Sequence, residues 1–141
     1  MPRTVDISKQ LVNLSVLLTE DDPLALKVHT CFLERMGFKV DIAMDGREAL
    51  EKYSKNNAFY SLAVLDARLP YMDGFDFAKY IREYESNNNI KRMPIIVVSA
   101  ESYEELKQKC TAVGVDNFAQ KPVAYTGLVN LIMKYINNGV T

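Results

Sequence analysis

Short apolar runs alternate with longer stretches of helical periodicity along most of this chain. The runs lie at residues 16–18, 40–43, 62–65, 95–98 and 118–119, and each is followed by a helical pattern. The sequence therefore predicts five consecutive strand–helix units. Because the runs are apolar at successive positions, we expect helices to cover both faces of one parallel sheet, which is an α/β fold.

The helical stretches carry local signals for their ends. Asp22 is a candidate N-cap before Pro23 at the first helical position, and Gly37 can close the same helix in the left-handed conformation. Further helices are expected at residues 46–56, 74–85 and 103–113, with a polar loop at 87–89. The last helix places one apolar stripe at i, i+3, i+4, i+7 and i+8, which should pack on the sheet: Leu128, Leu131, Ile132, Tyr135 and Ile136.

The chain of 141 residues has a common size for a single domain, and no internal repeat or low-complexity tract interrupts it. We expect that domain to span residues 14–137. Residues 1–13 have mixed polarity and no strong period, which is compatible with a linker from a longer parent or a short extra helix. Residues 138–141 are expected to be a C-terminal tail.

Net charge, apolar run length and cysteine spacing argue against several kinds of partner and site. Lys and Arg total 17 against 18 Asp and Glu, so the net charge of −1 gives no overall field for nucleic acid or an anionic membrane. The apolar runs are too short to span a membrane, and the N-terminal residues lack a signal-peptide core, so the expected location is cytoplasmic. Cys31 and Cys110 have no Cys or His at metal-ligand spacing and are expected to be reduced, partly buried thiols.

Chemically distinctive residues follow the predicted strands. Glu20 and Asp21 come after the first strand, Asp66 after the third, Ser99 at the end of the fourth, and Lys121 after the fifth. In open parallel sheets, ligands bind beyond the carboxyl ends of the strands, so these side chains should meet at one edge. Independent loop chemistry has no reason to arrange such a set.

The set suits phosphoryl transfer to a carboxylate. Clustered carboxylates repel one another, and a divalent cation with oxygen ligands, Mg²⁺, would relieve this repulsion. Asp66 could then attack phosphorus in line, while the metal and Lys121 neutralise the transferring oxygens and Ser99 supplies a hydroxyl. The activated phosphoryl group would come from the donor.

Four ordered motifs carry a family resemblance, at residues 17–22 (LLTEDD), 64–74 (VLDARLPYMDG), 97–100 (VVSA) and 118–122 (FAQKP). Over residues 14–137 the sequence resembles a receiver domain of two-component response regulators. The resemblance implies a flavodoxin-like, doubly wound sheet of order 2-1-3-4-5. It also implies a phosphorelay switch that a histidine kinase or a histidine phosphotransfer domain phosphorylates on Asp66, and that catalyses only its own phosphorylation and dephosphorylation.

The resemblance further assigns roles to single positions. It implies Mg²⁺, with Mn²⁺ as a substitute, held by Asp21, Asp66, the backbone carbonyl of Arg68 and, through water, Glu20. It implies a cis bond before Pro122. Ser99 and Phe118 would move together on phosphorylation and alter the surface of the fourth helix, fifth strand and fifth helix, where a downstream protein would bind. Arg68 and Glu101 flank the expected route of attacking water and are candidates for setting the phosphate lifetime.

Several residues depart from the family's commonest pattern or have simpler interpretations. Glu20, Ser99 and Phe118 stand where Asp, Thr and Tyr are frequent, and Phe118 lacks the hydroxyl that would favour an outward position. Asp22 is better explained as a helix cap and Asp73 as a turn or helix start. His29, the only histidine, is expected to be a partly exposed helix residue without a catalytic role.

Two other functional classes remain open from the sequence. One is a phosphatase or phosphotransferase with an aspartyl-phosphate intermediate, although such enzymes usually carry a second Asp where this chain has Arg68. The other is a receiver-like module that binds a partner without being phosphorylated. The sequence is also compatible with either a stand-alone regulator or the receiver segment of a hybrid histidine kinase.

Overall fold

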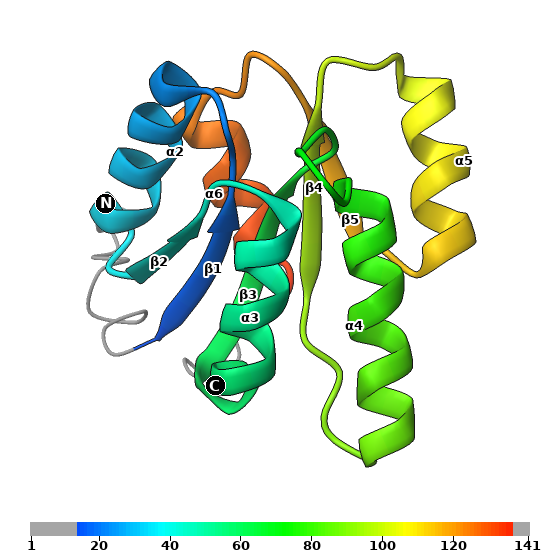
Figure 1. The fold of residues 1–141 in the computed structure, drawn as a ribbon. Helices are drawn as coiled ribbons and strands as arrows, with labels where there is room; N and C mark the ends of the chain where they lie inside the picture. Colours follow the sequence, from blue (N-terminus) through cyan, green and yellow to red (C-terminus); the bar gives the residue numbers. More distant parts are fainter. Residues whose placement is uncertain (1–13, 137–141) are drawn as a thin grey trace.

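The computed structural model describes residues 14–136, which form five strands and five α-helices in alternation (Figure 1). A 3-10 turn, η1, precedes the third strand. In chain order the elements are β1 (Ser15–Thr19), α2 (Pro23–Arg35), β2 (Lys39–Ala43), α3 (Gly46–Asn56), η1 (Asn57–Phe59), β3 (Tyr60–Asp66), α4 (Gly74–Asn88), β4 (Ile95–Ser99), α5 (Tyr103–Val113), β5 (Asn117–Gln120) and α6 (Tyr125–Met133).

All neighbouring strands pair in parallel, in the order β2-β1-β3-β4-β5. This confirms the predicted sheet and its flavodoxin-like topology. Thr19 pairs with Leu65, Asp66 with Val98, and Ser99 with Gln120, so four strands end at nearly the same level. The loops that follow them therefore converge at one edge of the sheet.

Two layers of helix cover the sheet, one on each face (Figure 1). One face packs on α2 and α6 through a cluster that includes Val16, Leu33, Ile96 and Ile132. The other face packs on α3, α4 and α5 through a second cluster that includes Leu17 and Phe77. Successive residues of β1 thus enter opposite cores, which is why the strands are apolar at every position.

The predicted loop at residues 87–89 was wrong, and so was the helical position of the last two apolar stripe residues. Helix α4 continues through Asn88, and Asn89 closes it with a left-handed φ of 55°, its N–H reaching the carbonyl of Glu85. The polar residues at 87–89 are therefore mostly helical, and the Asn88 amide donates to the Tyr84 carbonyl at 2.9 Å. Helix α6 ends at Met133, so the last two members of the predicted stripe lie in the following turn, where Ile136 is still buried.

Other local predictions can be compared directly. Asp22 and Asp73 are N-caps, each accepting a hydrogen bond from the N–H three residues later, at 2.8 Å. Cys110 is buried but Cys31 is exposed, so the prediction of two partly buried thiols was wrong for Cys31.

Among residues 14–136, no helix is long and apolar enough to cross a bilayer. The predictions for residues 1–13 and 138–141 lie outside the described residues.

Candidate functional site

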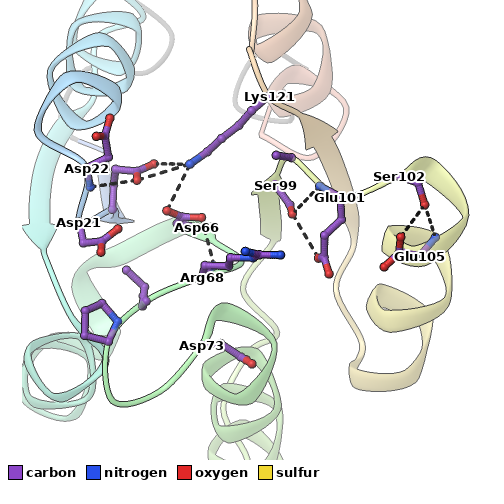
Figure 2. Close-up of a pocket in the computed structure, with 14 residues that line it drawn as sticks. Asp21, Asp22, Asp66, Arg68, Asp73, Ser99, Glu101, Ser102, Glu105 and Lys121 are labelled. Carbon is purple, nitrogen blue, oxygen red and sulfur yellow. Dashed lines mark hydrogen bonds and ion pairs between the residues drawn. The ribbon is translucent and has the colours of Figure 1, made fainter.

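The loops at the carboxyl edge of the sheet enclose a cleft of about 710 Å³ (Figure 2). Its lining brings together all five residues predicted from their positions after the strands: Glu20, Asp21, Asp66, Ser99 and Lys121. Their elements are far apart in sequence, and only the parallel order of the sheet makes them neighbours. The structure therefore places these side chains around one cleft.

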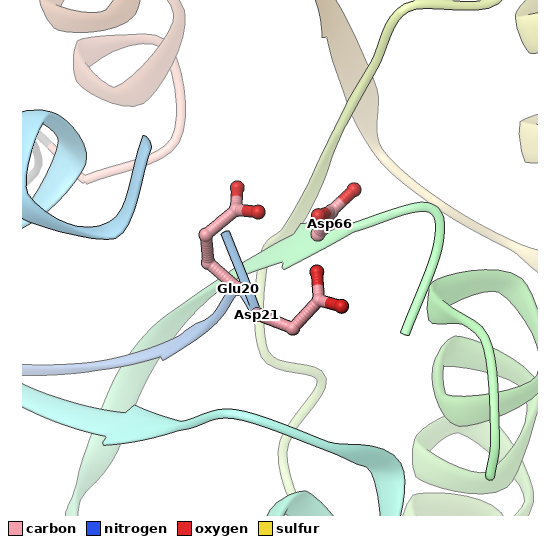
Figure 3. Close-up of side chains that lie close together, drawn as sticks. All are labelled: Glu20, Asp21 and Asp66. Carbon is pink, nitrogen blue, oxygen red and sulfur yellow. The ribbon is translucent and has the colours of Figure 1, made fainter. Parts of the chain in front are cut away.

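Three carboxylates form the acidic part of the cleft (Figure 3). Glu20, Asp21 and Asp66 each offer an oxygen, and these atoms lie within 4.8 Å of one another. Glu20 is 1% exposed and Asp66 6%, whereas Asp21 is exposed. An all-oxygen donor set that opens to solvent on one side fits Mg²⁺, which keeps several waters and takes few protein ligands.

The electrostatics of Glu20 show that this cluster lacks positive charge. Burial, followed by the closeness of Asp66, raises the pKa of Glu20 to about 7, and the ammonium of Lys121 only partly opposes this rise. A buried carboxyl next to another carboxylate is costly to ionise unless a cation is close. The donor set therefore fits a divalent ion electrostatically as well as geometrically.

Lys121 supplies the one ammonium of the described residues that contacts these carboxylates. Its Nζ lies 3.1 Å from Glu20 Oε1 and 3.2 Å from Asp66 Oδ2. Burial disfavours its charge, but the two carboxylates outweigh this effect and raise the pKa of Lys121. The bond between Lys121 and Pro122 is cis, as the family resemblance implied.

Backbone contacts fix the position of Asp66 at the end of β3. Its N–H donates to Thr19 Oγ1 at 3.1 Å, and its Oδ1 accepts from the Arg68 N–H at 3.1 Å. Gly74 approaches so closely that a Cβ there would lie 2.3 Å from the Asp66 carbonyl oxygen. The carboxylate is thus held with Oδ2 toward Lys121 and Oδ1 toward the β3–α4 loop.

Ser99 lies in the cleft, but its hydroxyl is directed to Glu101. Ser99 Oγ donates to Glu101 Oε2 at 3.2 Å and accepts from the Glu101 N–H at 3.0 Å (Figure 2). The side chain of Ser99 is buried, 3% exposed. The described residues therefore show Ser99 next to the acidic group, with its proton engaged elsewhere.

The remaining predicted residues lie around this centre. Arg68 and Glu101 line the cleft, and Phe118 lies outside its lining, with its ring centroid 5.2 Å from that of Tyr103. The metal ligation by the Arg68 carbonyl, the switching of Phe118 and the effects on phosphate lifetime stay predictions.

Sequence reasoning missed three contributors. His29 is 5% exposed rather than partly exposed, and its Nδ1 lies 3.7 Å from Glu20 Oε1. Burial, followed by the charge of Lys121, lowers the pKa of His29. Thr19 and Gly74 hold the Asp66 backbone, as described above. Thr19 and Gly74 both lie within the motifs described above, next to Glu20 and at the end of the longest motif. The contacts of Thr19 and Gly74 with Asp66, and of His29 with Glu20, arise only in the folded chain, so the sequence alone did not reveal them.

Sequence comparison identifies related chains. The profile of the response regulator receiver domain matches residues 16–133. The peroxide stress-activated histidine kinase mak1 of Schizosaccharomyces pombe is 35% identical over 124 residues, covering 87% of this chain and 8% of that kinase. Hybrid signal transduction histidine kinase B of Dictyostelium discoideum is 35% identical over 131 residues, covering 86% and 7%. The chain thus spans less than a tenth of the length of these two relatives.

Solved structures with a similar fold are also receiver domains. The receiver domain of a Pseudomonas aeruginosa sensor histidine kinase, with magnesium coordinated in its active-site cleft, is 26% identical with a TM-score of 0.77, covering 89% of this chain and 98% of that one. The receiver domain of the Saccharomyces cerevisiae response regulator Ssk1, crystallised with the histidine phosphotransfer protein Ypd1, is 26% identical with a TM-score of 0.79, covering 89% and 90%.

Proposed function

This chain belongs to the response regulator receiver domain family, and on that premise we propose that it is a phosphorelay switch whose phosphoacceptor is Asp66. Receiver domains of this family act in two-component signalling. The single observation that carries the assignment to Asp66 is the position of its carboxylate at the end of the central strand β3, where Oδ2 contacts Lys121 and Oδ1 accepts from the Arg68 N–H. Glu20 also belongs to the acidic cluster and contacts Lys121, but its carboxyl is 1% exposed and its pKa is raised to about 7, which makes it the poorer nucleophile.

Asp66, Lys121 and Ser99 have different roles in the proposed phosphoryl transfer. The Asp66 carboxylate attacks phosphorus in line, a new O–P bond forms, and the bond from phosphorus to the donor's leaving group breaks. Lys121, already 3.2 Å from Asp66 Oδ2, neutralises charge on the phosphoryl oxygens. Ser99 has a hydroxyl to donate to another of these oxygens once it leaves Glu101.

Glu20, Asp21, Asp66 and the Arg68 carbonyl are proposed to hold Mg²⁺, with Mn²⁺ as a substitute. The acidic cluster supports this proposal, as does the magnesium in the cleft of the Pseudomonas receiver domain. When bound, the ion supplies positive charge against the phosphoryl oxygens and helps to align them. It would also remove the repulsion that raises the pKa of Glu20.

We propose a histidine kinase or a histidine phosphotransfer domain as the phosphoryl donor. The related kinases and the Ssk1–Ypd1 complex support this class of partner. The surface of α5, β5 and α6 is the proposed binding face for a downstream protein. Ser99 lines the cleft at the end of β4, and Phe118 of the neighbouring strand β5 packs against Tyr103 of α5.

Incubation with acetyl phosphate and Mg²⁺, followed by intact mass measurement, tests the function. We expect one added phosphoryl group of about 80 Da on the wild type and none on Asp66→Asn. Asp73→Asn is the matched control, since Asp73 lines the same cleft but serves as a helix cap that Asn can replace. An unmodified wild type, or equal modification of Asp66→Asn, contradicts the assignment, and sustained turnover of an aryl phosphate would favour the phosphatase alternative.

A further inference from the structure

A second set of polar contacts, beside the acidic centre, joins Ser99, Glu101 and Lys109. The two carboxylate oxygens of Glu101 have different partners: Oε2 accepts from the Ser99 hydroxyl, and Oε1 accepts from Lys109 Nζ. The Glu101 N–H also donates to Ser99 Oγ at 3.0 Å. Figure 2 shows the contacts between Ser99 and Glu101, and the bond from Lys109 connects Glu101 in turn to helix α5.

Glu101 is held from several sides. Its side chain is 11% exposed, while that of Lys109 is 49% exposed, so the carboxylate is the less exposed partner of the pair. The Gln120 amide, at the end of β5, donates to the Glu101 carbonyl at 3.1 Å. Lys109 in turn lies over the ring of Phe75, 5.4 Å from its centroid, at the start of α4.

The charge state of Glu101 is consistent with a persistent pair. The hydrogen bond from Lys109, which is the largest cause, lowers the pKa of Glu101 below its ordinary value. The carboxylate is therefore ionised at neutral pH and acts only as an acceptor. An ionised acceptor holds the proton of a nearby hydroxyl more strongly than a neutral one.

The Ser99 hydroxyl cannot serve two acceptors at once. It has one proton, which it can donate either to Glu101 or to a phosphoryl oxygen on Asp66. Any contact that holds Glu101 against Ser99 thus stabilises the unphosphorylated arrangement, and a ligand that needs the hydroxyl must overcome that contact.

We propose that Lys109 is a positioning residue that, by holding Glu101 against Ser99, keeps the Ser99 hydroxyl away from Asp66 until the phosphoryl group arrives. This inference rests on the proposed phosphorylation of Asp66. Lys109 lies outside the cleft lining and needs no contact with the phosphoryl group. It acts through Glu101, and the pair biases the resting arrangement of the β4–α5 loop.

Affinity for beryllium trifluoride with Mg²⁺, a mimic of the phosphoryl group, provides the test by calorimetry. Lys109→Met should bind the mimic about two- to fivefold more tightly than the wild type, which is the range expected for loss of a partly exposed ion pair. Lys109→Arg keeps the charge and should restore the wild-type affinity. Lys107→Met removes a lysine from the same helix that makes no ion pair among the described residues, so it controls for net charge.

A double-mutant cycle separates this role from a general effect on the loop. In a Ser99→Ala background the hydroxyl is absent, so Lys109→Met should no longer change the affinity. A purely structural role of Lys109 would change the affinity equally in both backgrounds. A lack of coupling between the two substitutions therefore overturns the inference.

The outcomes also distinguish the inference from the function on which it rests. A wild type that does not bind the mimic with Mg²⁺ overturns the proposed function, and the inference with it. A wild type that binds while Lys109→Met has unchanged or weaker affinity overturns the role of Lys109 alone.

Discussion

At the scale of single residues, the position of Asp66 depends on how closely its neighbours approach. Gly74 has room for a hydrogen where any other residue has a Cβ, and its N–H donates to the Ala67 carbonyl at 3.0 Å. Lys121 reaches two carboxylates at once because Glu20 and Asp66 follow adjacent strands. The contacts of Gly74 and of Lys121 each lead to a prediction for a substitution at that residue.

Replacing Gly74 by alanine should destabilise the fold. The added Cβ would lie 2.3 Å from the Asp66 carbonyl oxygen, which is backbone and can only move with β3. We expect the free energy of unfolding to fall by about 1–3 kcal/mol in urea denaturation. Gly127→Ala in α6 is the control, since nothing lies within 4 Å of its Cβ and alanine favours a helix. Equal stability of the two variants would contradict the close approach at Gly74.

Replacing Lys121 by methionine should separate metal binding from phosphoryl transfer. Without the ammonium, phosphorylation by acetyl phosphate should slow about a hundredfold, the usual cost of losing one charge-stabilising donor. Mg²⁺ should bind at least as tightly, because a competing cation has left Glu20 and Asp66. Phosphorylation rates by intact mass and Mg²⁺ affinity by calorimetry measure both effects, and Lys107→Met is the control. An unchanged phosphorylation rate would exclude Lys121 from the chemistry.

At the scale of elements, the guanidinium of Arg82, whose side chain is 13% exposed, joins three segments at the edge of the sheet opposite the cleft. Arg82 of α4 bonds Glu85 Oε1 at 2.8 Å, Asp116 Oδ2 at 2.8 Å, and the carbonyls of Gly114 and Met93 at 2.9 Å. Glu85 also accepts from the Met93 N–H at 2.6 Å. This network connects α4 to the segments that enter β4 and β5.

Arg82→Met should therefore weaken the fold more than an exposed arginine would. Its removal leaves the buried Glu85 without its cation and Asp116 with Arg92 alone, and breaking a buried pair costs about 3–5 kcal/mol. Arg92 also pairs with Asp116, but its side chain is 56% exposed, so Arg92→Met should cost about 1 kcal/mol or less. Urea denaturation of both variants measures the difference, and similar losses would show that the buried network is not special.

The same elements show what the sequence could and could not predict. The number of helices and the edge where Glu20, Asp66 and Ser99 meet followed from the apolar runs, and the strand order followed from the family resemblance. The end of α4 was misjudged because Asn89, not a glycine, takes the left-handed closing position. The contacts of His29 with Glu20 and of Lys109 with Glu101 were missed because the two residues of each pair are eight or nine positions apart and only the tertiary fold brings them together.

At the scale of the whole molecule, the parallel sheet brings four loops to one edge and leaves two helical layers to hold them there. Residues of one strand pack into both cores, so the strand ends are fixed from two sides. The cleft can therefore combine a fixed carboxylate, a group of further carboxylates and an ammonium, while the polar contacts of Glu101 reach helix α5. Our central claim is that these groups of the cleft all act on one nucleophile, the carboxylate of Asp66.

Mapping the phosphorylated carboxylate tests that claim most directly. After labelling with acetyl phosphate and Mg²⁺, borohydride reduces an aspartyl phosphate to homoserine, which tandem mass spectrometry locates in the sequence. We expect homoserine in place of Asp66 and at no other aspartate, with Asp21 and Asp73 intact. Reduction at Asp21, or labelling spread over several carboxylates, would contradict it.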